Sequence, residues 1–272
     1  MDACNLCGGT GWDTLEEAGD TRVVRCECGL VFIIPQPARS LIERAYDAEY
    51  YAPWETQRAL REGIWRRRFE RMESLFSAPG RLLDVGCGMG EFLRLARARG
   101  WRVSGTELSP YAVRAAAALG LTVSEGEIWE AALPSDAFDV VTCWHVLEHA
   151  ADPRRIVEEA HRVLGPGGWL VLATPNLEDR IFRAAYRLAR GRAAPLFEPD
   201  ERELHLFHFS PRTLGRLVGA VGFEVVEIGF DRGAATGGGK RLVNEVAYLW
   251  FRLTGLNWGM ALELWARKPL TP

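Results

Sequence analysis

An acidic residue followed by alternating glycines is the feature of this sequence best suited to binding a small ligand. In the run Leu-Leu-Asp-Val-Gly-Cys-Gly-Met-Gly the acid is Asp84 and the glycines are Gly86, Gly88 and Gly90, and a second acid, Glu107, follows 23 residues after Asp84. Glycines let the backbone approach a ligand closely, and an acid at this distance hydrogen-bonds ribose hydroxyls in doubly wound nucleotide sites. A carboxylate before the glycines would repel a pyrophosphate, but it suits a cationic ligand with an amino group. We therefore expect a ribose-containing cationic ligand.

Four of the six cysteines lie within the first 28 residues, in two close pairs. Cys4 and Cys7 are separated by two residues, and Cys26 and Cys28 by one. In a reducing cytoplasm such pairs indicate metal ligation rather than disulfides, and four thiolates in a tetrahedron suit Zn²⁺. We expect a structural zinc ribbon, although ribbons usually have two residues inside each pair. The alternative is a cysteine-containing hairpin without an ion.

Histidines are the candidates for proton transfer, because the unperturbed imidazole pKa of about 6.5 lies near neutral pH. Of the five histidines, four are expected at the carboxyl edge of a sheet: His145, His149, His205 and His208. The alternative for each is a hydrogen-bonded residue of the core.

Short apolar strands alternate with helices from Arg81 onward, and these elements must position the groups above. Strands are expected over 81–85, 102–106, 121–124, 138–143, 168–173, 223–230 and 258–267, and helices over 90–99, 110–118, 153–163, 211–221 and 240–253. This alternation is typical of parallel βαβ units. We therefore predict an α/β fold with a doubly wound, seven-stranded, mainly parallel sheet, Rossmann-like, over residues 80–272.

The remaining segments predict a zinc ribbon over 1–36, a helical connector over 37–79 and inserts at 177–209 and 232–256. We expect two helices in the connector, and its aromatic residues either cover a ligand or dock the ribbon on the main domain: Tyr46, Tyr50, Tyr51 and Trp54. Packing is the simpler interpretation. The first insert contains an amphipathic helix suited to a lid. The second insert contains an aromatic helix with several possible roles. We expect it to line a substrate pocket, to meet a lipid-linked substrate, to contact a second copy of the chain or to be buried in the core.

Several of these motifs together resemble the class I S-adenosylmethionine-dependent methyltransferases. They are the acid-glycine loop, Phe-Asp-Val-Val at 138–141, His-Val-Leu-Glu-His at 145–149 and Arg-Val-Leu-Gly-Pro-Gly-Gly at 162–168. The resemblance covers about residues 80–268, and the N-terminal cysteines extend it to zinc-ribbon methyltransferases of bacterial sugar and natural-product pathways. The stretch ending at His149 is also similar to the ubiquinone-pathway O-methyltransferases.

The resemblance implies S-adenosylmethionine as the cofactor and assigns residues to it. Gly86, Cys87 and Gly88 would line its methionine part beside Asp84, Glu107 would bind the ribose, and Leu108 would pack on the adenine. Glu127 and Ile128 would meet the adenine edge, while Trp144 and His145 would close the pocket near the methyl donor. Core packing is the alternative for Trp144 and Ile128.

The resemblance implies methyl transfer to a small molecule with His149 or His205 as the base. Sugar C-methyltransferases of this kind carry Glu-His-x-x-Tyr-Phe-Ser, and here Leu204 and His208 replace the glutamate and the tyrosine. We therefore expect O-methylation of a sugar or natural-product hydroxyl, including quinone-like rings. C- or N-methylation of a metabolite, a divalent ion held by His145, Glu148 and His149 on one helical face, and a non-catalytic role are the alternatives.

The composition limits the partners that we expect. The chain has 272 residues, 48% of them hydrophobic, and a net charge of −3. Neither a membrane span nor a signal peptide is evident, so we expect a cytoplasmic enzyme. Methylation of a ribosomal-RNA base is the second hypothesis, because the chain also resembles ribosomal-RNA guanine methyltransferases that pair a zinc ribbon with this domain. The negative net charge argues against it, since it does not favour binding to nucleic acid. The arginine run Arg66, Arg67 and Arg68 is expected on a solvated helix face. The oligomeric state stays open.

Overall fold

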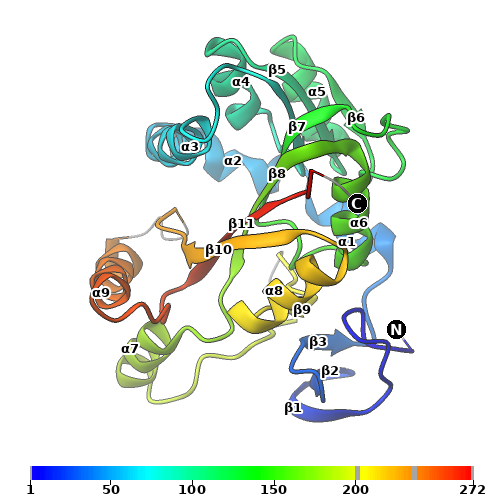
Figure 1. Ribbon diagram of the computed structural model, residues 1–272. Helices are drawn as coiled ribbons and strands as arrows, with labels where there is room; N and C mark the ends of the chain where they lie inside the picture. Colours follow the sequence, from blue (N-terminus) through cyan, green and yellow to red (C-terminus); the bar gives the residue numbers. More distant parts are fainter. Residues whose placement is uncertain (1, 200–202, 234–237, 271–272) are drawn as a thin grey trace.

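The computed structural model describes residues 2–199, 203–233 and 238–270 (Figure 1). Its large sheet has the strand order β10-β11-β8-β7-β4-β5-β6. The strands are β4 (Arg81–Val85), β5 (Arg102–Glu107), β6 (Val123–Glu125), β7 (Phe138–Trp144), β8 (Leu164–Pro175), β10 (Glu224–Phe230) and β11 (Ala261–Arg267). Strands β4 to β8 pair in parallel, and β11 runs antiparallel to both of its neighbours. The predicted seven-stranded, mainly parallel sheet is confirmed.

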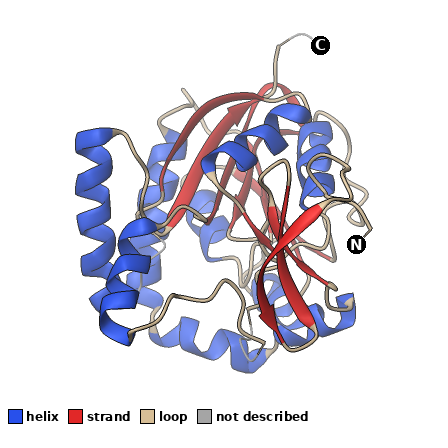
Figure 2. Cartoon of the chain, turned by 90° about the horizontal axis from the view of Figure 1, so that it is seen from below, coloured by secondary structure: helices blue, strands red, loops and turns tan. Residues whose placement is uncertain are grey.

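Helices cover both faces of this sheet, as Figure 2 shows for the red strands and blue helices. Neighbouring residues of a strand point to opposite faces, so Leu83 packs in the core of one face and Leu82 in the core of the other. The first face is covered by α6 (Pro153–Val163) and α8 (Pro211–Ala220). The second is covered by α3 (Arg58–Glu73) and α4 (Glu91–Ala98), and α5 (Pro110–Ala118) follows β5. Burial on both faces explains why the strands are almost continuously apolar.

The N-terminal segment forms a second, antiparallel sheet with the order β1-β2-β3-β9. It contains β1 (Trp12–Ala18), β2 (Thr21–Cys26) and β3 (Val31–Ile34), and β9 (Phe207–His208) is contributed by the segment that we expected to be an insert. Phe32 pairs with Phe207 and is fully buried. The cysteine-bearing hairpin is therefore tied to the end of the predicted insert 177–209, and the domain boundaries stay predictions.

The connector contains three helices, so the expectation of two was wrong. They are α1 (Arg39–Ala45), α2 (Ala48–Thr56) and α3, and Pro53 lies inside α2. The expectation of a solvated arginine face also holds only in part. Arg66 and Arg67 are exposed, but Arg68 is buried with 6% exposure, because it pairs with Asp231.

Two helices at the lower left of Figure 1 pack on each other beside the sheet. They are α7 (Arg180–Arg190), which follows β8, and α9 (Gly238–Thr254), which lies between β10 and β11. Across residues 2–199, 203–233 and 238–270, no helix has both the length and the apolar character that crossing a membrane requires.

The strand order changes direction at β4. Strands β5 and β6 follow on one side of β4, and β7 and β8 are added on its other side. In open α/β sheets ligands bind outside the carboxyl ends of the strands at such a switch point. The acid-glycine loop follows the carboxyl end of β4, so the topology places it at the expected binding edge.

Candidate functional site

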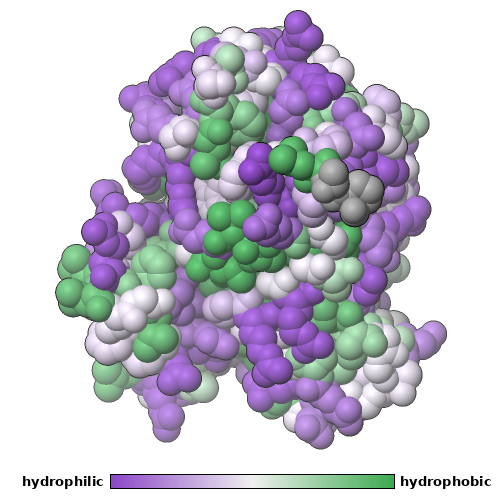
Figure 3. All heavy atoms as spheres, in the orientation of Figure 1, coloured by the Kyte–Doolittle hydropathy of each residue, from purple (hydrophilic) through white to green (hydrophobic). Residues whose placement is uncertain are grey.

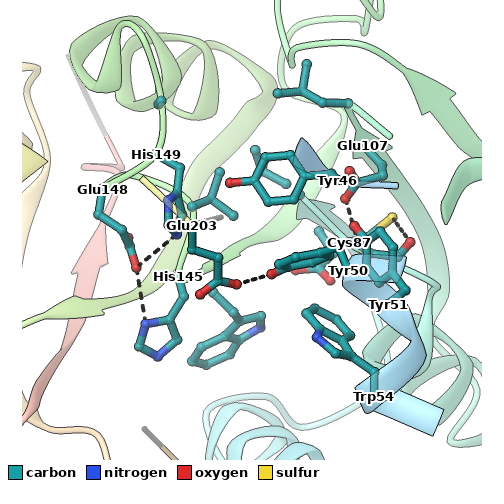
Figure 4. Close-up of a pocket in the computed structure, with 18 of the residues that line it drawn as sticks. Tyr46, Tyr50, Tyr51, Trp54, Cys87, Glu107, His145, Glu148, His149 and Glu203 are labelled. Atoms are coloured by element: carbon teal, nitrogen blue, oxygen red, sulfur yellow. Dashed lines mark hydrogen bonds and ion pairs between the residues drawn. The ribbon is translucent and has the colours of Figure 1, made fainter. Parts of the chain in front are cut away.

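A cavity of about 410 Å³ lies at the carboxyl ends of the parallel strands (Figure 4). This volume is in the range of small-molecule sites. The cavity brings together most of the sequence-predicted site residues, namely Asp84, Gly86, Cys87, Gly88, Glu107, Leu108, Glu127, Trp144, His145, His149 and His205. Ile128 does not line it. That side chain is fully buried in the core, which is the alternative considered for it.

The loop after β4 depends on glycine at the positions that face the cavity. Gly86 and Gly88 have φ values of +67° and +54°, a region that side-chain-bearing residues rarely adopt. A Cβ atom on Gly88 would lie 3.2 Å from the ring of Trp54. The side chain of Glu107 fixes the loop, because its two oxygens accept hydrogen bonds from the backbone nitrogens of Gly88 and Ser109, both at 2.8 Å. The conformation of the acid-glycine loop therefore depends on the Glu107 carboxylate.

Three buried carboxyl groups line this part of the cavity. Burial raises the pKa of Asp84 to about 7, although Thr142 donates a hydrogen bond of 2.6 Å to it. Burial also raises the pKa of Glu127 to about 7 and that of Glu107 above its usual range. A cation entering the cavity would offset the cost of ionising these groups. The electrostatics therefore favour a cationic ligand, as the acid before the glycines predicted.

Aromatic side chains from α2 and the turn before it line the cavity beside the acid-glycine loop (Figure 4). They are Tyr46, Tyr50, Tyr51 and Trp54, and the ring pairs within Tyr50, Tyr51 and Trp54 lie 4.8 to 5.6 Å apart. The Tyr50 hydroxyl donates a hydrogen bond to Glu203, which also lines the cavity. The structure places this cluster at the cavity. Of the two interpretations made from the sequence, this position favours the one in which the aromatic residues cover a ligand.

His145 lies in a buried charged network that the sequence analysis missed. Its Nε2 is 3.1 Å from Asp231 Oδ2, its Nδ1 is 3.3 Å from Glu148 Oε1, and Arg68 is paired with the same Asp231 at 2.5 Å. Burial alone would lower the pKa of His145, but Asp231 and Glu148 raise it to about 9. His145 is therefore cationic at neutral pH and is a donor in this network. In the sequence, the position of Asp231 directly after the strand expected over 223–230 could have identified it as a candidate site residue.

His149 and His205 approach each other beside Glu148, with ring centroids 5.0 Å apart. His149 Nδ1 lies 3.0 Å from the carbonyl oxygen of Leu204. A carbonyl only accepts, so Nδ1 carries a proton and Nε2, 3.9 Å from Glu148 Oε1, is left to exchange one. Burial lowers the pKa of His205 to about 4, so His205 is neutral at pH 7.

The geometry of this cluster corrects one expectation. Residues 145–149 form a turn and not a helix, and His145 has a φ of +57°. The three groups that share a centre are instead Glu148, His149 and His205, with one ligand atom each, all within 4.8 Å. His208 is buried in β9 and does not line the cavity. Burial lowers its pKa to about 3.

The four N-terminal cysteines converge although one pair has a short spacer. Cys4 Sγ lies 3.6 Å from Cys28 Sγ, Cys7 Sγ lies 3.5 Å from Cys26 Sγ, and the four sulfurs fall within 4.8 Å of one another. A tetrahedral Zn²⁺ with Zn–S bonds of about 2.3 Å separates its sulfurs by about 3.8 Å, and a disulfide needs only about 2.05 Å. The arrangement fits a zinc ion and not two disulfides.

Comparison with known proteins agrees with these observations. A family model described as a methyltransferase domain matches residues 56–228. The chain is 32% identical over 161 residues to a ubiquinone biosynthesis O-methyltransferase of Thiobacillus denitrificans, which covers 56% of this chain and 67% of that protein. It is 33% identical over 165 residues to the enzyme of the same name from Pseudomonas entomophila, covering 57% and 69%.

Solved structures share the fold at low sequence identity. An S-adenosylmethionine-dependent methyltransferase from Thermotoga maritima superposes with a TM-score of 0.57 at 19% identity, covering 85% of this chain and all of that one. The cyclase SpnF superposes with a TM-score of 0.53 at 22% identity, covering 75% and 80%. Since one of these is a cyclase, the shared fold does not by itself specify the reaction.

Proposed function

This chain belongs to the methyltransferase domain family, and from that premise we propose that it methylates a hydroxyl oxygen of a small ring compound, with S-adenosylmethionine as donor and His149 as base. The observation that carries the proposal is the position of His149 beside Glu148 in the same cavity as the acid-glycine loop. O-methylation agrees with the reaction named for the relatives.

The residues present fit the cofactor. Each carboxylate oxygen offers two acceptor sites, so Glu107 keeps one free on each oxygen for ribose hydroxyls while it holds Gly88 and Ser109. Asp84 would face the cationic amino acid end, and Gly86 and Gly88 would let the backbone approach it. Leu108 and Glu127 would meet the adenine. When bound, S-adenosylmethionine supplies an electrophilic methyl group on a sulfonium.

The acceptor hydroxyl must lose its proton as its oxygen attacks, and His149 is the group proposed to take it. Nε2 is the nitrogen left to receive that proton, because Nδ1 donates to the Leu204 carbonyl. The carboxylate of Glu148 stabilises the imidazolium that forms, and Thr174 donates a hydrogen bond of 3.0 Å to the other oxygen of Glu148. His205 is neutral and is proposed to orient the acceptor by a hydrogen bond.

An aromatic acceptor fits this site better than a sugar. An imidazole takes a proton more readily from a phenol, whose pKa is about 10, than from an aliphatic alcohol. The cavity lining includes three tyrosines and a tryptophan, with the Tyr46 ring 6.3 Å from the ring of His149, and such side chains pack well on a planar ring. We therefore place phenols and quinols first and sugar hydroxyls second among the acceptors.

A divalent cation is the alternative for the same cluster. Glu148, His149 and His205 offer one oxygen and two nitrogen ligands within 4.8 Å, and such ligands suit several transition metals. A bound cation would activate the acceptor hydroxyl directly. Activity that survives exhaustive chelation would leave proton transfer to His149 as the explanation.

The test is a methyl-transfer screen with labelled cofactor against phenols, sugars and RNA. We expect transfer to phenols, a kcat for His149→Ala lower by about 10² to 10⁴, and a smaller loss for His205→Ala. His161→Ala is the matched control, because His161 lies in α6 and does not line the cavity. Calorimetry should give the same cofactor affinity for all three variants. Wild-type rates in His149→Ala would exclude it as the base, and transfer to RNA alone would overturn the proposed substrate class.

A further inference from the structure

Helices α7 and α9 form a two-helix unit that contributes little to the core. No residue of α7 is buried, and the buried residues of α9 are Asn244 and Ala247. The two helices pack on each other, and Figure 1 shows them to one side of the large sheet. Most of the surface of these two helices is therefore not needed to form the core and is available for an interaction.

That surface carries a continuous apolar stripe along α9. Its members are Leu242, Val246, Leu249 and Leu253, with exposed fractions of 69%, 51%, 61% and 85%. Their spacing of four, three and four residues places them on one face of the helix. Figure 3 shows apolar side chains gathered over α9 at the left edge of the molecule. Isolated exposed leucines are common, but an aligned row with this exposure marks an interaction surface.

The two helices are basic, in contrast to the chain as a whole. Helix α7 contains Arg180, Arg183, Arg187 and Arg190, and no acidic residue occurs from 180 to 192. Lys240, Arg241 and Arg252 lie on α9 with a single acid, Glu245. The net charge of the whole chain is −3. The positive charge is thus concentrated on the unit that carries the exposed leucines.

Aromatic side chains complete the surface. Trp250 of α9 stacks on Trp258 with ring centroids 4.8 Å apart, and Arg180 lies over the ring of Trp258. Both tryptophans are partly exposed. Helices that lie on a membrane combine a leucine face, flanking arginines and lysines, and tryptophan at the boundary.

We propose that the α7–α9 unit binds the surface of an anionic phospholipid bilayer, with the leucine stripe of α9 inserted at the boundary between headgroups and acyl chains. The basic residues attract the lipid phosphates, and each one that lies near the surface contributes to the free energy of membrane binding. A second copy of the chain is a poorer occupant, because a two-fold dimer would place the same arginine-rich patch against itself.

The proposed membrane surface and the cavity lie near each other in the sequence. Gly233 lines the cavity, and α9 begins at Gly238. If the proposed function holds, a bilayer-bound enzyme would receive apolar ring compounds dissolved in the membrane, and membrane binding itself does not depend on that activity.

The experiment is co-sedimentation of the full chain with vesicles of phosphatidylcholine alone or mixed with phosphatidylglycerol. We expect binding to the mixed vesicles that weakens as salt is added and little binding to phosphatidylcholine. Leu249→Ser with Leu253→Ser should lower the partition coefficient at least about tenfold. The matched control is Leu75→Ser with Leu119→Ser, two leucines that are each 42% exposed outside the unit, and it should bind as the wild type does. Circular dichroism checks that both variants are folded.

Two results would overturn the proposal. The first is no binding to mixed vesicles, and the second is equal binding by the stripe variant and the wild type. If vesicles do not bind the protein and light scattering shows a dimer that the stripe variant converts to a monomer, the stripe is a self-association surface instead. Since binding is measured without substrate, an inactive protein that still binds vesicles would contradict the proposed function alone.

Discussion

Replacement of Asp231 by asparagine tests the buried charged network behind the cavity. Asp231 and Arg68 have side-chain exposures of 1% and 6%, and Asp231 also contacts His145 at 3.1 Å. Asp231→Asn keeps the shape but leaves the buried Arg68 and the partly buried His145 without their shared anion. Breaking a buried pair in this way costs about 3 to 5 kcal/mol, so the free energy of unfolding at pH 7 should fall by that amount.

The pH dependence of the same variant gives a second magnitude. A pKa of His145 raised from 6.5 to about 9 corresponds to about 3 kcal/mol of stability. Because the folded pKa is the higher one, this stability is fully present below about pH 6.5 and is lost as the pH rises through about 9. Removing the Asp231 charge lowers the folded pKa of His145, so the difference in stability between wild type and variant should shrink as the pH rises.

Chemical unfolding across this pH range, together with an NMR titration of the His145 ring, measures both quantities. Glu245→Gln is the control, since its pair with Arg232 is 43% and 45% exposed and should contribute only about 0 to 1 kcal/mol. The reasoning is wrong if Asp231→Asn costs less than about 1 kcal/mol or if His145 titrates at the same pH in both proteins.

Three further predictions concern the acid-glycine loop and the cysteines. Gly88→Ala should raise the cofactor dissociation constant at least about tenfold by calorimetry, because a Cβ at φ +54° would press on Trp54, whereas Gly219→Ala, with open space around it, should change nothing. Cofactor affinity should weaken as the pH falls below about 7, because protons then compete for Asp84, and an affinity that is flat with pH in the wild type would contradict this. Elemental analysis should find about one zinc per chain, which Cys7→Ser should lose and Cys143→Ser should keep.

Much of the fold could be predicted from the sequence because its signals are local. The strands around Leu82 and Leu83 are buried on both faces, so each appears as a short apolar run before a helix. Helix starts were also readable, since Ser109 and Asp152 cap α5 and α6 before a proline. The connector was harder, because it contains three helices where two were expected, and Pro53 lies inside α2. The fit of a proline within a helix depends on neighbours that the local sequence does not reveal.

The sequence by itself determined the sheet, the acid-glycine loop and the set of candidate ligands, because residue type and spacing along one element specify them. The tertiary structure alone decided which groups meet. It joined Glu148 and His149 to His205 from a segment more than fifty residues away, made His145 a cation through Asp231, and buried Arg68. Contacts of this kind depend on distances between distant segments, and charge states depend on burial, so neither is encoded in local spacing. The acid-glycine loop was therefore readable at once, whereas the roles of the histidines beside it required the folded chain.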